Sequence, residues 1–171
     1  MSSEQSSLVI GIMSGTSIDG IDVALTRICE KYINTLSTQF SPFDPSLKNW
    51  LAELASAAQW NPDHYYQTEY QLTLAYANAV NLLLEQTRLQ PTEIAAVACH
   101  GQTVRHQPEL QTPYTVQMVN GALLSEKTDI TVITDFRARD IAAGGEGAPL
   151  APGFHYHFFS ASHPNACVVN I

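Results

Sequence analysis

The fold is decided by a stretch near the N-terminus in which an apolar run ends in a short polar turn and a second apolar run begins at once. This stretch reads Leu8-Val9-Ile10-Gly11-Ile12-Met13-Ser14-Gly15-Thr16-Ser17-Ile18-Asp19-Gly20-Ile21-Asp22. Apolar and β-branched residues on both sides of an Asp-Gly turn predict two antiparallel strands joined as a hairpin. We expect these strands over residues 8–13 and 20–28.

The turn between the two strands has the composition of an anion-binding loop. Its glycines allow the backbone to approach a phosphate closely, and successive amide N–H groups can converge on an anion. The hydroxyls of Ser14, Thr16 and Ser17 add further donors. Asp19 or Asp22 can hold Mg²⁺ through water, because this cation keeps much of its hydration shell. The alternative is an ordinary Asp-Gly hairpin turn. The stretch is not a P-loop, because no Gly-Lys-Ser/Thr sequence follows it.

Composition and charge narrow the class of protein. A chain of 171 residues that is 45% hydrophobic fits one globular domain. A net charge of −8 argues against a nucleic-acid partner, because a phosphate backbone binds to a basic surface. The cysteines at 29, 99 and 167 are widely spaced and predict free thiols in a reducing cytoplasm. No apolar run approaches the ~18 residues of a membrane span, and residues 1–7 lack the features of a signal peptide.

Beyond the hairpin the chain alternates between helical and strand patterns, which predicts an α/β fold with a mixed sheet. We expect helices over about residues 47–58 (capped by Asp44 or Ser46), 62–87, 121–128 and 152–160, and strands over 31–40, 94–99, 114–118, 130–134 and 166–171. The segment 135–152 is rich in glycine and charge, which predicts a site loop. The last strand ends the sequence without a turn or cap, so we expect the architecture to continue beyond Ile171.

A second polar cluster follows the strand expected over residues 94–99. It reads Cys99-His100-Gly101-Gln102-Thr103-Val104-Arg105-His106. Because α/β proteins bind ligands at the C-terminal ends of strands, we expect this segment in a site. Its amide, hydroxyl, imidazole and guanidinium groups suit a polyhydroxylated ligand. Metal binding by Cys99, His100 and His106 is the alternative, although no second Cys/His pair lies at zinc spacing.

A third cluster alternates acids and arginines ahead of a glycine-rich run. It reads Asp135-Phe136-Arg137-Ala138-Arg139-Asp140-Ile141-Ala142-Ala143-Gly144-Gly145-Glu146-Gly147-Ala148-Pro149-Leu150. Arginine binds phosphate or carboxylate through two parallel hydrogen bonds, which favours a ligand site. The same residues also suit an internal salt-bridge network at the start of a helix. The sequence leaves both roles open.

Taken together and in this order, the three segments resemble the anhydro-N-acetylmuramic acid kinase family over residues 8–171. The resemblance implies a ribonuclease-H-like lobe over residues 1–171, with a mixed sheet flanked by helices, as the first half of a two-lobe actin-like ATPase fold cut before its second lobe. It implies a cytoplasmic kinase of peptidoglycan recycling that uses ATP and Mg²⁺. Its substrates would be an anhydro amino sugar and water, and its products N-acetylmuramic acid 6-phosphate and ADP.

The resemblance also implies roles for individual residues. The ATP phosphate segment would comprise Gly15, Thr16, Ser17, Ile18, Asp19, Gly20, Ile21 and Asp22, with Asp19 as a water-mediated metal ligand. The sugar pocket would comprise His100, Gln102, Thr103, Arg137, Arg139 and Asp140. The family's catalytic base is an Asp in an Asp-Thr-Gly-Pro-Gly-Asn segment, which this sequence does not contain. We therefore expect no catalytic residue in this chain and no turnover by the chain alone.

The sequence departs from the family pattern at one segment, and it also allows two functions other than a kinase. Where the family commonly reads Gln-Ile-Gly-Asp, this chain reads Gln117-Met118-Val119-Asn120, so a glycine and a carboxylate are lost. A non-catalytic module that binds a sugar or a partner subunit is one alternative. A glycoside hydrolase with Asp135 and Asp140 as its carboxylate pair is the other, and it would act without ATP. An apolar surface awaiting a second lobe predicts self-association, for example as a homodimer.

Overall fold

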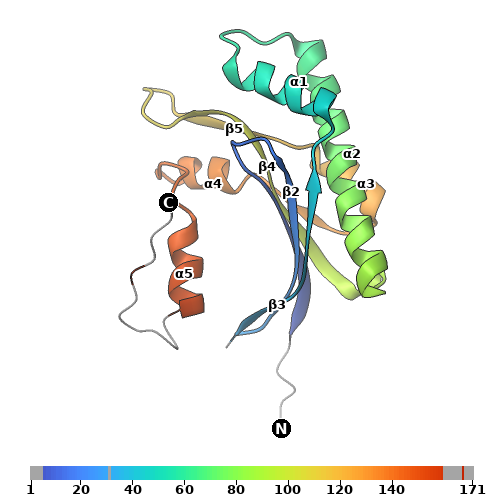
Figure 1. Cartoon of the computed structure of the whole chain (residues 1–171). Coiled ribbons are helices and arrows are strands. Elements are labelled where there is room, and N and C mark those ends of the chain that lie inside the picture. The colour runs from blue at the N-terminus through green and yellow to red at the C-terminus, as the bar shows by residue number, and fades with distance from the viewer. Residues whose placement is uncertain (1–5, 31, 160–166, 168–171) are drawn as a thin grey trace.

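The computed structural model describes residues 6–30, 32–159 and 167, which form a mixed six-stranded sheet and its flanking helices (Figure 1). The strands are β1 (Ser7–Ser14), β2 (Gly20–Ile28), β3 (Ile33–Pro42), β4 (Ile94–Gln107), β5 (Tyr114–Met118) and β6 (Val132–Ile133). The helices are α1 (Pro45–Ser56), α2 (Pro62–Thr87), α3 (Gly121–Thr128), α4 (Phe136–Ala142) and α5 (Ala151–Phe159), with a 3₁₀ turn at Pro91–Glu93. The α/β class with a mixed sheet flanked by helices is confirmed.

The strand order places the first hairpin beside β4. The order is β3-β2-β1-β4-β5, and β6 also pairs with β4. β1 and β2 run antiparallel, as the hairpin pattern predicted, and the structure places Met13 opposite Asp22. β1 and β4 run parallel, and Ser14 at the end of β1 lies opposite Gln102. The polar turn after β1 therefore lies next to the middle of the second motif.

One face of the sheet forms the core with the long helices. Alternate residues of the strands, such as Ile10, Val23 and Val97, are buried beneath α1, α2 and α3. α2 contributes a buried stripe at helical spacing that includes Leu72 and Tyr76. Among the described residues, only α4 and α5 lie on the side of the opposite face (Figure 1). No described helix is long and apolar enough to cross a membrane.

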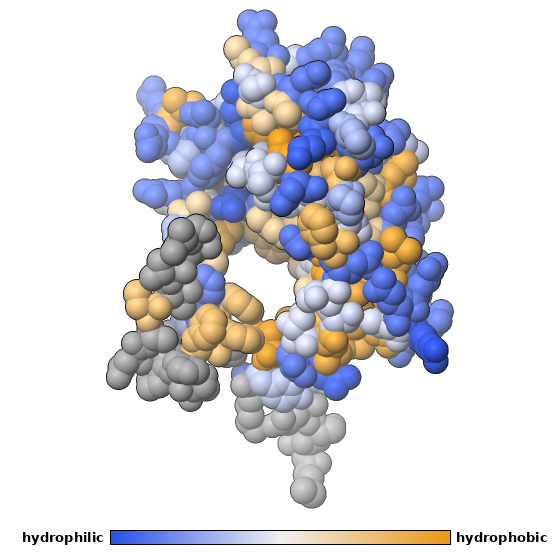
Figure 2. All heavy atoms as spheres, in the orientation of Figure 1, coloured by the Kyte–Doolittle hydropathy of each residue, from blue (hydrophilic) through white to orange (hydrophobic). Residues whose placement is uncertain are grey.

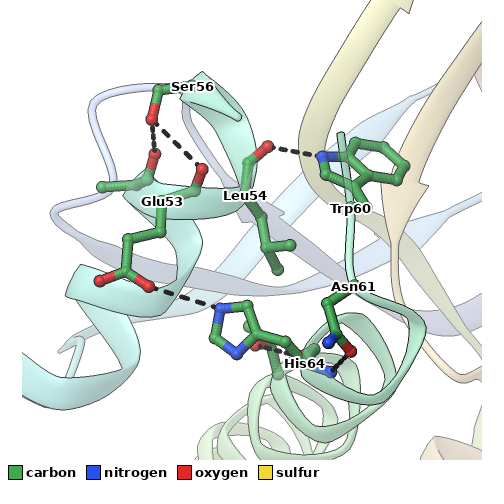
Figure 3. A network of polar contacts seen from close by, with 8 residues as sticks. Glu53, Leu54, Ser56, Trp60, Asn61 and His64 are labelled. Carbon is green, nitrogen blue, oxygen red and sulfur yellow. Dashed lines mark hydrogen bonds and ion pairs between the residues drawn. The ribbon is translucent and has the colours of Figure 1, made fainter. Parts of the chain in front are cut away.

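The junction between α1 and α2 is held by side chains (Figure 3). Asn61 caps α2 by accepting from the amides of Asp63 and His64, and the Trp60 Nε1 donates to the Leu54 carbonyl at 2.8 Å. His64 also lies 3.5 Å from Glu53 of α1. These contacts fix the corner that the end of β4 packs against.

Arg105 ties β4 to that corner instead of facing a ligand. Its Nη2 donates to the Ala57 carbonyl at 2.5 Å, and its guanidinium carbon lies 5.0 Å from the centre of the Trp60 ring. The first contact is a charge-assisted hydrogen bond and the second is a cation–π contact. Arg105 is therefore a structural residue of the second motif.

Replacing Arg105 by alanine should lower the free energy of unfolding by about 2 kcal/mol, because a charged hydrogen bond and a cation–π contact are lost together. Urea unfolding monitored by circular dichroism measures this. The control is Arg27→Ala, since Arg27 is exposed on β2 and its loss should cost less than ~0.5 kcal/mol. Equal effects of the two substitutions would contradict the structural role of Arg105.

Two sequence predictions about element boundaries were wrong. The strand expected to end at Cys99 continues to Gln107, so the second motif lies inside β4 and not after it. The reason is pairing on both sides, with β1 and then with β5. The segment 135–152 is not a loop throughout, because α4 and the start of α5 lie within it. The strand expected over residues 166–171 lies outside the described residues except for Cys167, which is exposed.

Candidate functional site

The turn after β1 is closed by its own backbone. The Ile18 amide donates to the Gly15 carbonyl at 3.1 Å, and Ile18 adopts a left-handed conformation with φ 52°. The side chain of Ile18 is buried, whereas Thr16 and Ser17 are exposed. The turn thus presents backbone and hydroxyl groups to solvent while an apolar side chain anchors it in the core.

Asp19 organises the outer side of the turn. Its Oδ1 accepts from the Ser17 hydroxyl at 2.8 Å and from the Gly20 amide at 3.1 Å. The Ser17 hydrogen bond is the main reason that the pKa of the exposed Asp19 carboxyl lies below its usual value. An ionised and exposed carboxylate on a hydroxyl-bearing turn fits the water-mediated contact that Mg²⁺ makes in proteins.

Ser14, which precedes the predicted phosphate segment, and several residues of that segment face inward. The Ser14 hydroxyl is buried and makes a 2.6 Å hydrogen bond with the Tyr76 hydroxyl of α2, so it is not a donor to a ligand. Ile21 is also buried in the core and offers only its backbone. Gly20 lies against the Phe40 ring, which leaves no room for a side chain there.

Gln102 contacts the turn from its buried side. It is 1% exposed, and its Nε2 donates to the Gly15 carbonyl at 2.9 Å. Thr103, the next residue on β4, is half-buried and accepts from Gln117 Nε2 at 3.2 Å. The structure therefore brings Gln102 to the phosphate turn, while Thr103 faces the side chains of β5.

His100 and Arg137 form the clearest contact between the second and third motifs. His100 Nε2 accepts from Arg137 Nε at 2.7 Å, and His100 Nδ1 lies 2.7 Å from the Gly101 carbonyl. Because a carbonyl only accepts, Nδ1 must carry the ring proton and Nε2 must be unprotonated. Burial lowers the pKa of His100, the nearby Arg137 charge adds to this, and the Gly101 carbonyl partly opposes it. His100 is thus a neutral anchor for a guanidinium.

The third motif uses its charges to shape the glycine-rich run. Arg137 Nη1 donates to the Gly147 carbonyl at 2.7 Å, and the Asp140 Oδ2 accepts from the Gly147 amide at 2.7 Å. A methyl group on Gly145 would lie 2.2 Å from the Asp140 carboxylate. Arg137 and Asp140 thus have a structural role, but through hydrogen bonds to the backbone of the glycine-rich run, where the sequence suggested a salt-bridge network. Arg139 is exposed at the end of α4.

A shallow groove of about 400 Å³ lies on the sheet face that α1, α2 and α3 do not cover. Its lining includes Met13, Asp22, Phe40, His100 and Phe136. Met13, Phe40 and Phe136 are exposed apolar residues, as an uncovered lobe surface would have. Figure 2 shows further hydrophobic residues on α5, around an open space between this helix and the sheet. The predicted homodimer stays a prediction.

A metal centre of protein ligands is not part of this site. Within residues 6–30, 32–159 and 167, no three His, Cys, Asp or Glu side chains come together as metal ligands. Cys99 is buried in the core, and burial raises the pKa of its thiol to about 12, whereas His100 faces the groove. The alternative of Cys99, His100 and His106 as joint ligands is therefore not supported.

The segment that departs from the family pattern has a structural role. The Asn120 side-chain oxygen caps α3 by accepting from the Leu123 backbone amide at 2.9 Å. The backbone amide of Asn120 donates to the Thr73 hydroxyl of α2. Asn and Asp are equally good at this cap position, so the cap survives the loss of the carboxylate. Val119 packs close to Gly101, the residue with φ 75° inside β4.

Acidification should weaken the folded protein through His100. Because the pKa of His100 is lower in the folded protein than its ordinary value of 6.5, the unfolded chain binds more protons between the two values. Stability from this group is complete above pH 6.5 and is lost as the pH falls through the folded value, with a slope of at most about 1.4 kcal/mol per pH unit. Urea midpoints between pH 7.5 and 5 measure this dependence.

The comparison variant for this pH series is His100→Gln, which cannot titrate. As the pH falls, the free energy of unfolding of this variant should decrease less steeply than that of the unsubstituted protein. His64 and the other histidines are the same in both proteins, so their contribution cancels in the comparison. Parallel curves for the two proteins would show that His100 does not carry the effect.

The sequence of this chain is similar to that of one protein family. Residues 7–171 match the family described as anhydro-N-acetylmuramic acid kinase. A relative of that name from Hahella chejuensis is 53% identical over 94% of this chain and 44% of its own length. Another from Nitrosomonas europaea is 47% identical over 95% of this chain and 45% of its own length. The chain thus spans less than half the length of the curated relatives it matches.

Solved structures offer a much weaker likeness. An Aquifex aeolicus member of the Ppx/GppA family aligns with a TM-score of 0.35 at 10% identity, over 78% of this chain and 37% of that one. A reductive activator for corrinoid, iron-sulfur protein aligns with a TM-score of 0.43 at 14% identity, over 78% of this chain and 23% of that one. Likenesses of this size carry no information about activity.

Proposed function

Because this chain belongs to the anhydro-N-acetylmuramic acid kinase family, we propose that it is the phosphate-binding lobe of an ATP-dependent sugar kinase. The reaction is the conversion of 1,6-anhydro-N-acetylmuramic acid and water to N-acetylmuramic acid 6-phosphate in cytoplasmic peptidoglycan recycling. The observation that carries the proposal is the closed turn at residues 15–19, whose exposed hydroxyls and ionised Asp19 stand at the end of β1.

The turn would bind the phosphate tail of ATP. Thr16 offers a hydroxyl and an amide donor on the exposed side of the turn, and Ser17 offers its amide, because its hydroxyl donates to Asp19. Gly15 allows close approach. Asp19 would hold Mg²⁺ through water, and the ion would neutralise charge on the phosphates. In phosphoryl transfer such positioning and charge stabilisation supply most of the rate enhancement.

The sugar would bind on the side of His100 and the third motif. Both ring nitrogens of His100 are engaged, so this residue would offer its ring face and the orientation that it gives Arg137. Thr103 and the exposed Arg139 supply a hydroxyl and a charged donor. Arg137 and Asp140 would keep the glycine-rich run in shape. A lactyl carboxylate or a ring hydroxyl is the kind of group that such donors recognise.

The experiment is calorimetric titration of the protein with ATP·Mg²⁺ and, separately, with the anhydro sugar, combined with a coupled assay of ADP release. The kinase proposal expects both ligands to bind, and it expects no turnover by the 171-residue chain alone, because the family's base segment is absent from it. Robust turnover by this chain would overturn the second expectation. Binding of neither ligand would overturn the proposal itself.

A binding module without catalysis is the second candidate. It is favoured by the fact that hydrogen bonds within this lobe already hold the turn and the glycine-rich run in shape. Sugar binding without ATP binding, in the same titrations, would favour it over the kinase. The hydrolase alternative is less well supported, because the Asp140 carboxylate already holds the Gly147 amide.

A further inference from the structure

The Gln102 side chain is buried in an unusual way. It is 1% exposed within β4, its Nε2 donates to the Gly15 carbonyl, and its Oε1 accepts no hydrogen bond from the part of the chain that the structure describes. The orientation of the amide is fixed by its partner, because the Gly15 carbonyl can only accept. The oxygen must therefore point away from that carbonyl.

This arrangement does not favour stability. An intramolecular hydrogen bond contributes about 1 kcal/mol net, whereas a buried acceptor without a partner costs about 1–3 kcal/mol. The Gly15 carbonyl also has a second donor, the Ile18 amide, so it would remain satisfied without Gln102. An apolar side chain of similar length would fit the same place at least as well, which calls for another explanation of the amide.

We propose that Gln102 is a positioning residue for the nucleotide phosphates, acting through the Gly15 carbonyl, and not a residue of the sugar pocket. This inference rests on the proposed kinase function. The Gln102 amide and the Ile18 amide hold the Gly15 carbonyl from two directions. With that carbonyl turned inward, the amide groups of Thr16 and Ser17 keep one orientation at the exposed side of the turn.

The location of the other second-motif side chains supports this assignment. His100, two residues before Gln102, lines the groove and contacts Arg137 of the third motif. The Gln102 side chain instead donates to the Gly15 carbonyl of the turn. Behind the turn, Ser14 and Tyr76 add a second buried hydrogen bond at the end of β1. The turn is thus clamped from β4 and from α2.

The test uses Gln102→Met and Gln102→Glu in the 171-residue chain, which the proposed function expects to bind both ATP·Mg²⁺ and the anhydro sugar. The methionine keeps length and burial but removes the donor, and it also removes the unpaired oxygen, so the unfolding midpoint should change little. Once ionised, the glutamate directs a carboxylate oxygen, which only accepts, at the Gly15 carbonyl, which also only accepts. Burial raises the pH at which this carboxyl ionises. Gln102→Met, and Gln102→Glu at a pH where its carboxyl is ionised, should raise the Kd for ATP·Mg²⁺ about 10-fold and change the Kd for the anhydro sugar less than 2-fold.

A pH series adds a rescue that a merely structural role would not produce. Lowering the pH protonates the introduced carboxylic acid, which can then donate to the Gly15 carbonyl, so ATP·Mg²⁺ affinity of Gln102→Glu should recover relative to Gln102→Met. An equal rise in the Kd for both ligands, or a rise in the Kd for the sugar alone, would overturn the proposal.

A separate readout distinguishes this inference from the proposed function. Hydrogen exchange of the Ile18 amide, measured by NMR without ligand, should be faster in Gln102→Met because the carbonyl that it binds is less constrained. If the unsubstituted protein binds no ATP·Mg²⁺, the kinase proposal fails, and with it the assignment of Gln102 to nucleotide phosphates. The exchange rate then still shows whether Gln102 holds the turn, and an unchanged rate would exclude even that.

Discussion

Replacing Gly20 by alanine should lower the free energy of unfolding by about 3 kcal/mol, the upper range for overpacking a well-ordered core. The added Cβ would lie 2.5 Å from the Ser41 carbonyl oxygen and 2.5 Å from the Phe40 ring. The Ser41 carbonyl belongs to β3, which is paired with β2 along its length, so the backbone cannot move aside cheaply. For a domain of this size the melting temperature should fall by about 10 °C.

The matched control for this prediction is Gly11→Ala in β1, where an added Cβ would meet nothing within 4 Å. Its effect should stay below ~0.5 kcal/mol. Thermal unfolding of both variants by calorimetry measures the difference. Similar melting temperatures for the two would show that the strand closure next to the turn is looser than its geometry indicates.

In a complete two-lobe kinase, of which we propose this chain is the phosphate-binding lobe, replacing Asp19 by asparagine should reduce activity about 100-fold, a loss typical of one preorganised electrostatic group at a reacting phosphate. Asparagine keeps an oxygen that can accept from the Ser17 hydroxyl and the Gly20 amide, so the turn should persist. What is lost is the negative charge that would hold Mg²⁺ through water.

Raising the Mg²⁺ concentration should partly restore the activity of Asp19→Asn, because a weakened ion site responds to mass action. The control is Glu126→Gln, which removes one exposed negative charge on α3 far along the chain from the turn. Steady-state assays over a range of Mg²⁺ concentrations measure both variants. Full activity of Asp19→Asn at low Mg²⁺ would exclude Asp19 from the metal site.

Elements with strong local signals were predictable from the sequence. The prediction of a helix over residues 62–87 is confirmed, because Asn61 and Pro62 start it and apolar residues recur at helical spacing to its end. The strand at residues 114–118 and the helix at 121–128 are confirmed at the same bounds. The first hairpin was predictable because an Asp-Gly turn separates two apolar runs.

Elements that depend on distant partners were not predictable. β4 continues through a polar segment because β1 and β5 supply hydrogen bonds on its two sides, and Gly101 with φ 75° accommodates an irregular point within it. α4 is only seven residues long and starts after Asp135 in a left-handed conformation, so its sequence resembles a loop. Neither feature leaves a periodic pattern in the residues themselves.

The sequence indicated candidate residues for the site, which stay a prediction, but it did not indicate the partners that these residues contact. The turn, His100 and Arg137 were identified from composition and resemblance, yet His100 meets Arg137 across 37 residues and Gln102 meets Gly15 across 87. Arg105 resembled a ligand-binding residue until the structure placed it on Trp60 and the Ala57 carbonyl. Contacts between distant segments are set by the strand order, which single-sequence patterns do not specify.

The most direct measurement is ³¹P NMR of a complete two-lobe kinase, of which we propose this chain is the phosphate-binding lobe, incubated with ATP, Mg²⁺ and 1,6-anhydro-N-acetylmuramic acid in ¹⁸O-labelled water. The account predicts equal amounts of ADP and a sugar 6-phosphate, with the label at C1 of the sugar found by mass spectrometry, because water would open the anhydro bridge while O6 takes the phosphoryl group. Formation of free phosphate without sugar phosphate, or opening of the sugar without ATP, would contradict the account.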